Sequence, residues 1–113
     1  MPYIHAKTNT KITAEKEVSL KEKFGKAIEL IPGKTERWLM INFTDSERIW
    51  FAGDNAPAAI IEVELLGSAS DSEYDSLTEK LTEIVSAELE IDPTRVYIKY
   101  EEIEHWGWNS SNF

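Results

Sequence analysis

The residue best placed for chemistry is a proline that directly follows the initiator methionine. If Met1 is removed, as a small second residue normally permits, Pro2 carries a free secondary amine. An α-amino group titrates near a pKa of about 8, and burial beside a cation lowers that value, so such an amine can serve as a general base. The alternative is a terminal proline with no chemical role.

Other candidate groups are few. The chain has no cysteine, which excludes disulfides, thiolate metal sites and thiol redox chemistry. His5 and His105 are too far apart for a local ligand motif, so we expect no metal. Lys34 follows Gly33 in a polar loop, where it either binds an anionic group or simply faces solvent.

Composition limits the range of functions. The 113 residues suit a single domain, and 42% of them are hydrophobic. Lys and Arg number 12 against 21 Asp and Glu, and the net charge of -9 disfavours nucleic acids and anionic membranes as partners. There is no apolar run of about 20 residues and no signal-like start. We therefore expect a cytoplasmic protein, with secretion by a non-classical route as the alternative.

The first half of the chain has the pattern strand, helix, strand. Residues 3–8 alternate apolar and polar side chains, which predicts a half-buried strand. An apolar stripe at spacings of three and four predicts a helix over residues 14–31, which Pro32 and Gly33 end. The nearly continuous apolar run 38–43 predicts a strand buried on both faces, and residues 48–51 predict a further short strand.

The second half repeats this order. Residues 59–66 predict a strand that ends at Gly67. Ser70 and Glu73 have the spacing of a capping box at the start of a helix whose apolar stripe extends to Leu89. Asp92 and Pro93 are expected to end this helix, and residues 96–100 predict another strand.

Two βαβ halves follow, at about 2–51 and 57–101, with a tail at 102–113. The prediction is an α/β (α+β) fold in which a four-stranded mixed sheet carries both helices on one face. The other face is expected to expose Ile, Val and Trp side chains. Self-association would cover such a face, so we expect a homo-oligomer.

Several segments together resemble the macrophage migration inhibitory factor family. They are Pro2, Gly33-Lys34, Arg95–Tyr100 and the tail Gly107–Phe113, and the resemblance spans the chain from end to end. It implies one tautomerase domain over residues 1–113 and a homotrimer that encloses a channel. It also implies cofactor-independent keto–enol tautomerisation of α-keto acids, with three pockets at the subunit interfaces.

The resemblance also assigns roles within this pocket. Pro2 is the general base, Lys34 binds the substrate carboxylate, and the backbone of Leu66 donates to the substrate. Tyr97 comes from the adjacent subunit. The pocket wall that suits an aryl substituent consists of Trp38, Trp106, Trp108 and Phe113. From the residues alone, Leu66 is equally a core leucine, Tyr97 a buried strand tyrosine, and the aromatic tail an interface.

Some positions depart from the family pattern. Lys99 replaces an asparagine: it either adds a second ammonium to the pocket and favours a more anionic substrate, or faces solvent or pairs with Glu64. Trp38 and Trp106 replace smaller residues, which predicts a narrower pocket mouth. Residues 58–61 replace the family's C-x-x-C segment, so a thiol oxidoreductase activity has no chemical basis.

Three functions remain open at this stage. The first is tautomerisation of phenylpyruvate-type acids. The second is a cytokine-like trimer that binds a protein receptor and whose pocket is vestigial or only binds ligands. The third is a trimeric module that binds small aromatic acids without turnover.

Overall fold

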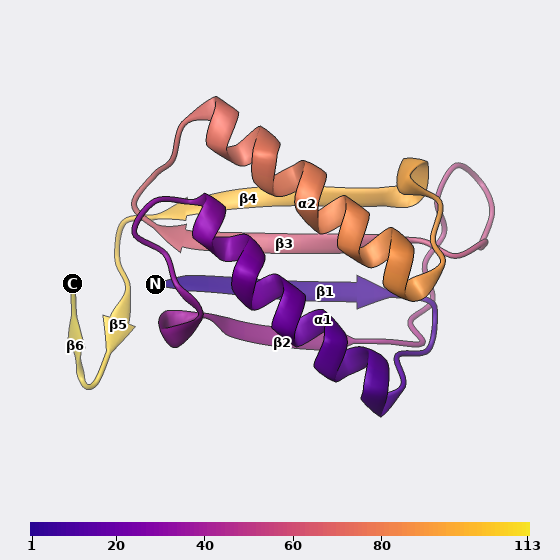
Figure 1. The fold of residues 1–113 in the computed structure, drawn as a ribbon, viewed down its shortest axis with the longest axis horizontal. Coiled ribbons are helices and arrows are strands. Elements are labelled where there is room, and N and C mark those ends of the chain that lie inside the picture. Colours follow the sequence, from indigo (N-terminus) through magenta and orange to yellow (C-terminus); the bar gives the residue numbers. More distant parts are fainter.

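The chain folds as one four-stranded sheet with two helices on the same face. The computed structural model describes residues 1–113. Figure 1 shows α1 and α2 side by side in front of the sheet, whose strand order is β2-β1-β3-β4. The strands are β1 (Pro2–Thr8), β2 (Met40–Thr44), β3 (Ala59–Leu66) and β4 (Val96–Ile103), and the helices are α1 (Ala14–Ala27) and α2 (Asp71–Leu89).

The strand pairing confirms the predicted fold class. Strand β1 is parallel to β2, and β3 is parallel to β4, each pair being linked through one helix. The two βαβ units join through the antiparallel pair β1 and β3 at the centre of the sheet. Both crossovers place their helix on the same face, as right-handed connections require in this topology.

Helix α1 begins and ends largely as predicted. The side chain of Thr13 accepts a hydrogen bond from the backbone N–H of Lys16 and caps the first turn. The apolar stripe buries Leu20 and Phe24 completely. The predicted last turn is a tighter 3-10 turn, η1 (Ile28–Leu30), which ends before Gly33 takes a φ of 81°.

Helix α2 has the predicted capping box. The N–H of Glu73 donates to Ser70 Oγ at 3.2 Å, and the N–H of Ser70 donates to Glu73 Oε1 at 2.8 Å. The helix ends at Leu89 because Glu90 adopts a left-handed φ of 55°. Asp92 therefore does not end the helix, and it instead caps a following 3-10 turn, η3 (Pro93–Arg95).

Two local predictions in the first half are wrong. The run 38–43 is not a strand buried on both faces: β2 begins at Met40, lies at the sheet edge and leaves Met40 67% exposed. Trp38 belongs to a preceding 3-10 turn, η2 (Glu36–Trp38). Residues 48–51 form no strand, and only an isolated bridge joins Phe51 to Asp54.

The hydrophobic core lies between the helices and the sheet. Alternate residues of the two central strands point into it, including Ile4, Ile61 and Val63, which are fully buried. Leu77 and Leu81 of α2 pack against the same layer. This core fixes the two central strands, and with them the position of the N-terminus.

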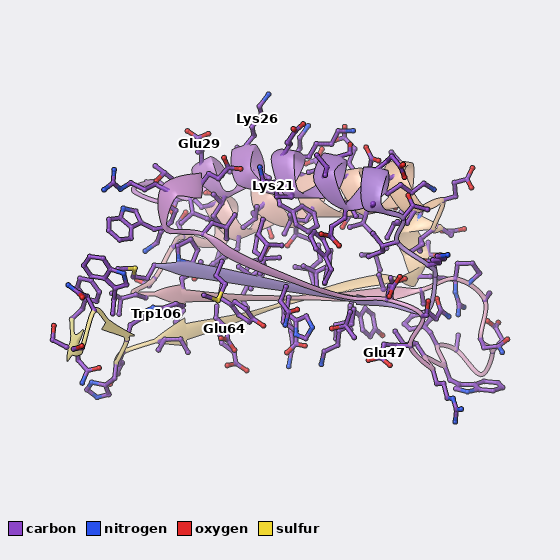
Figure 2. All side chains as sticks on the ribbon, turned by 90° about the horizontal axis from the view of Figure 1, so that it is seen from below. Lys21, Lys26, Glu29, Glu47, Glu64 and Trp106 are labelled. Carbon is purple, nitrogen blue, oxygen red and sulfur yellow. The ribbon has the colours of Figure 1, made fainter.

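The centre of the face without helices is polar. Of the Ile, Val and Trp side chains expected there, the strands place only Ile60 and Ile103 on this face, near its two ends. Glu62 is its centre: Oε1 lies 3.0 Å from Lys7 Nζ, and Oε2 lies 3.4 Å from Lys99 Nζ. His5 Nε2 bonds Thr44 Oγ1 at 2.7 Å beside this cluster. Figure 2 shows side chains with nitrogen and oxygen atoms, the labelled Glu64 among them, projecting below the sheet, opposite the helices.

Exposed aromatic residues lie instead at the two ends of the sheet. Trp38, Trp108 and Phe113 lie at the end where β1 begins, and Trp50 and Tyr97 lie at the other. The exposed aromatic surface that another chain could cover is therefore at these ends and not at the centre of the face without helices.

The Glu62 cluster makes stability depend on pH. Hydrogen bonding to Lys7 lowers the pKa of Glu62 from its ordinary 4.5, and Lys99 adds to the effect against partial burial. Its stabilisation is therefore present above about pH 4.5 and is lost as the pH falls through the folded-state value. We expect Glu62→Gln to lower the free energy of unfolding by about 1 kcal/mol at pH 7.

Urea unfolding at pH 7 and at pH 3, at one protein concentration, measures this difference. The control is Glu29→Gln, a carboxylate without an ion pair that Figure 2 shows in solvent beyond α1. A Glu62→Gln effect of equal size at both pH values would contradict the assignment.

Candidate active site

A cleft of about 500 Å³ opens at the end of the sheet where the chain begins. Figure 1 shows the N-terminus, the start of β2 and the C-terminal hairpin together at this end. The cleft is lined by Met1, Pro2, Tyr3, Arg37, Trp38, Leu39, Met40, Glu64, Trp106, Gly107 and Trp108. It combines an apolar wall with few charged groups, which is typical of small-molecule sites.

The N-terminus is held by groups from two other segments. Pro2 is buried and lies opposite Leu65 in the sheet. The N–H of Leu66 donates to the Met1 carbonyl at 3.1 Å, and Lys34 Nζ donates to the Leu66 carbonyl at 2.9 Å. The structure therefore brings together Pro2, Lys34 and Leu66, which the sequence analysis selected from three distant positions.

The amino group at this position is electrostatically perturbed. Burial lowers the pKa of the Met1 amine, and the neighbouring Lys34 ammonium lowers it further. Both effects act in the direction that favours a neutral amine, because each penalises a second positive charge. The surroundings are thus suited to a nitrogen that accepts protons.

The aromatic wall comes largely from the C-terminal tail. The tail forms a hairpin of β5 (Gly107–Trp108) and β6 (Ser111–Asn112). Trp108 meets Trp38 edge to face with ring centroids 5.1 Å apart, and Phe113 stacks on Trp108 at 6.3 Å. Trp106 lines the cleft directly, at the end of the sheet where Figure 2 labels it.

Five predicted site residues do not line the cleft: Lys34 and Leu66 lie beside Met1, Phe113 stacks on Trp108, and Tyr97 and Lys99 lie further away. Tyr97 pairs with Ile60 in the register, whereas Pro2 pairs with Leu65, so they are five residues apart along β3, or about 17 Å. Tyr97 is 59% exposed in the single chain, so the alternative of a buried strand tyrosine is wrong there. Lys99 pairs with Glu62, not with Glu64, and does not line its own chain's cleft.

The ring of Tyr97 is supported by a braced loop. Phe51 packs edge to face against Tyr97 with ring centroids 4.9 Å apart. The guanidinium of Arg95 donates to the carbonyls of Phe51, Asp54, Ala56 and Pro57 at 3.0 to 3.4 Å. It also pairs with the Asp54 carboxylate at 3.0 Å and lies over the Phe51 ring. Arg95 thereby fixes loop 51–57.

Besides Met1, the sequence analysis missed six residues of the cleft as site residues: Tyr3, Arg37, Leu39, Met40, Glu64 and Gly107. Tyr3 and Met40 are direct neighbours across β1 and β2, so the parallel register explains their joint presence. Arg37 enters because it precedes Trp38 in the short turn η2. In the sequence, the only sign that Arg37 belongs to the cleft is its position next to Trp38, a predicted wall residue.

Two further features concern metals and membranes. No three His, Asp or Glu side chains are grouped so that they could hold a metal ion. Neither α1 nor α2 is both long and apolar enough to cross a bilayer.

Comparison with known proteins agrees with this architecture over the whole chain. The family model described as macrophage migration inhibitory factor (MIF) matches residues 1–113. A macrophage migration inhibitory factor homolog of Brugia malayi is 28% identical, covering 100% of this chain and 99% of its own. The mouse macrophage migration inhibitory factor is 28% identical over 83 residues, or 72% of each chain.

Solved structures show the same fold. The crystal structure of Leishmania major MIF2 superposes with a TM-score of 0.94 at 30% identity, covering 100% of this chain and 97% of that one. A macrophage migration inhibitory factor homologue from Prochlorococcus marinus gives 0.89 at 27% identity, with 98% of each chain covered. Two fused βαβ units of this kind define the tautomerase superfamily fold. The chain belongs to the macrophage migration inhibitory factor family within it.

The bracing of loop 51–57 predicts a local effect of Arg95. We expect Arg95→Met to raise amide hydrogen exchange of residues 51–57 by at least about tenfold, because several carbonyls lose a charged donor worth about 1 to 3 kcal/mol. The control is Arg48→Met, which changes an arginine in the same connection that forms no ion pair. Equal exchange in the two variants would show that Arg95 does not brace the loop.

Proposed function

We propose that this protein is a keto–enol tautomerase of phenylpyruvate-type α-keto acids, with Pro2 as the general base once Met1 has been removed. The observation that carries the proposal is the buried position of Pro2 at the head of the central strand, with Lys34 and Leu66 gathered around the residue before it. This arrangement supports an amine held beside a site for an anion.

The first step is proton abstraction by the amine. A Pro2 nitrogen freed from Met1 would lie one residue further into the same surroundings, where burial and Lys34 oppose its protonation. A neutral secondary amine removes a proton from the carbon next to the keto group, and the electron pair forms the enolate. Return of the proton to oxygen completes the isomerisation, which needs no cofactor.

The substrate carboxylate has a natural place in this scheme. In the chain that retains Met1, the Met1 carbonyl accepts the Leu66 N–H, so this donor is already occupied. Loss of Met1 frees the donor and the space beside it. A carboxylate there would take the Leu66 N–H and the charge of Lys34, which is a charge-assisted arrangement.

The aromatic side chains suit the remainder of such a substrate. Trp38, Trp106 and Trp108 form an apolar wall that can pack on an aryl group and exclude water. Exclusion of water also strengthens the influence of Lys34 on a neighbouring charge.

A complete site requires a second chain. Tyr97 is exposed at the far end of the sheet, and the aromatic cleft is at the near end, so one chain cannot bring the two together. Contact between the far end of one chain and the near end of the next is heterologous, and such contacts close into a ring of three when each rotates the next chain by a third of a turn. We propose a homotrimer in which the Tyr97 hydroxyl of one chain reaches the developing enol oxygen in the cleft of another.

The alternative function is a trimer that binds another protein and uses the cleft only for ligands. The mouse relative is named for the inhibition of macrophage migration, which is a property of a signalling protein. Enolisation assays separate the two, because a ligand-only cleft binds keto acids without turnover.

The base assignment predicts a large loss on replacing Pro2. We expect the purified protein to lack Met1 by intact-mass measurement and to enolise phenylpyruvate. Pro2→Gly should lose about 10²-fold or more in kcat/KM, because the tuned secondary amine is replaced by a more flexible primary one. The control is Pro93→Gly, in the remote turn η3. A Pro2→Gly protein that is free of Met1 and keeps the full rate would refute the assignment.

The shared site predicts complementation between two inactive variants. Pro2→Gly and Tyr97→Ala subunits, unfolded together in equal amounts and refolded, should regain activity, because about a quarter of all sites after random reassembly combine an intact Pro2 with an intact Tyr97 from another chain. Refolding each variant alone provides the baseline. If mixed refolding never exceeds that baseline, either the two residues act within one chain or Tyr97 is not used.

A further inference from the structure

We propose that Arg37 makes the cleft selective for α-keto acids that carry a second anionic group on their side chain. This inference rests on the proposed function and narrows its substrate class. The observation behind it is a cation in the cleft wall that has no anionic partner in the chain.

Arg37 is placed in the cleft by the short turn η2, directly before Trp38. Its guanidinium carbon lies 5.3 Å from the centroid of the Trp38 ring, so the ring orients the positive group beside the apolar wall. The side chain is exposed, and it forms no ion pair and no hydrogen bond. The neighbouring Glu36 does not neutralise it, because the Glu36 carboxylate lies against Gly25 of α1.

The other cations nearby are committed. Lys99, the residue expected to supply a second positive charge, is paired with Glu62, as is Lys7. Lys34 donates to the Leu66 carbonyl beside the N-terminus, where the keto-acid carboxylate is proposed to bind. Arg37 is therefore the one basic side chain that lines the cleft itself.

A guanidinium stays charged at all relevant pH values and binds a carboxylate through two parallel N–H donors. An α-keto acid held at Lys34 by its own carboxylate would extend along the aromatic wall toward this group. A second carboxylate on the substrate's side chain would then pair with the Arg37 guanidinium, whereas a neutral aryl group would not. The expected substrate class is thus an α-keto acid with a distal carboxylate.

Glu64 is expected to disfavour a second anionic group on the substrate. Its carboxylate also lines the cleft, and no cation pairs with it. Figure 2 shows Glu64 on the side of the sheet away from the helices. An anionic substituent is therefore attracted by Arg37 and repelled by Glu64, so replacing each residue should change selectivity with opposite sign.

The test compares phenylpyruvate with 4-carboxyphenylpyruvate. Dissociation constants are measured by titration calorimetry on the Met1-free protein, and kcat/KM is measured in parallel. We expect Arg37→Gln to reduce the preference for the carboxylated acid by about tenfold, Arg37→Lys to retain part of it, and Glu64→Gln to increase it a few-fold. The control is Lys26→Gln, the same loss of charge on the solvent side of α1.

The outcomes separate this inference from the proposed function. A preference that stays the same in Arg37→Gln, or falls equally in Lys26→Gln, overturns the role of Arg37 even if the enzyme is active. Selective binding that depends on Arg37 without any enolisation supports the role of Arg37 and refutes the tautomerase. A wild-type protein that binds neither acid overturns both.

Discussion

The two-sided pairing of the first strand is the constraint on which the site depends. Chain termini are usually mobile because few contacts hold them. Here β1 pairs with β3 from Pro2 onward and with β2 from Tyr3 onward, so the start of the chain is at the centre of the sheet. Proline is tolerated as the first residue of a strand because it lacks only a donor that is not needed there. A shift of one residue would turn Ile4 out of the core, so the register is strongly specified.

Much of the fold could be predicted because its signals are local. The capping box at Ser70 and the apolar stripes of the helices need only neighbouring residues to be recognised. The position of a strand within the sheet is not a local property. The run 38–43 is as apolar as a central strand, yet β2 lies at an edge, so Leu39, Ile41 and Phe43 pack on the core only in part while Met40 is exposed. The polar face was misjudged for the same reason, since it depends on which strands become neighbours.

The candidate site, too, depends on contacts between residues that are far apart in the sequence. Pro2, Lys34 and Leu66 come from three elements, and only the family resemblance connected them before the structure did. The partner of Lys99 depends on the parallel register, which sets it opposite Glu62, whereas Glu64 stands opposite Glu101. The spacing of residues along the sequence does not reveal this register. Lys99 is thereby held by an ion pair and not left free to meet a substrate of its own chain.

Electrostatics and assembly then bear on the same question, which is how a strongly acidic protein admits an anion. The net charge of -9 repels anions at long range, but solvent and salt screen that field beyond about 10 Å. Within the cleft the relevant charges are few, and Lys34 and Arg37 are the cations among or beside the apolar groups. A neighbouring chain that covered the cleft mouth would remove water and strengthen both charges. In the proposed trimer, binding of the anion and completion of the site are thus two consequences of one contact between the ends of adjacent sheets.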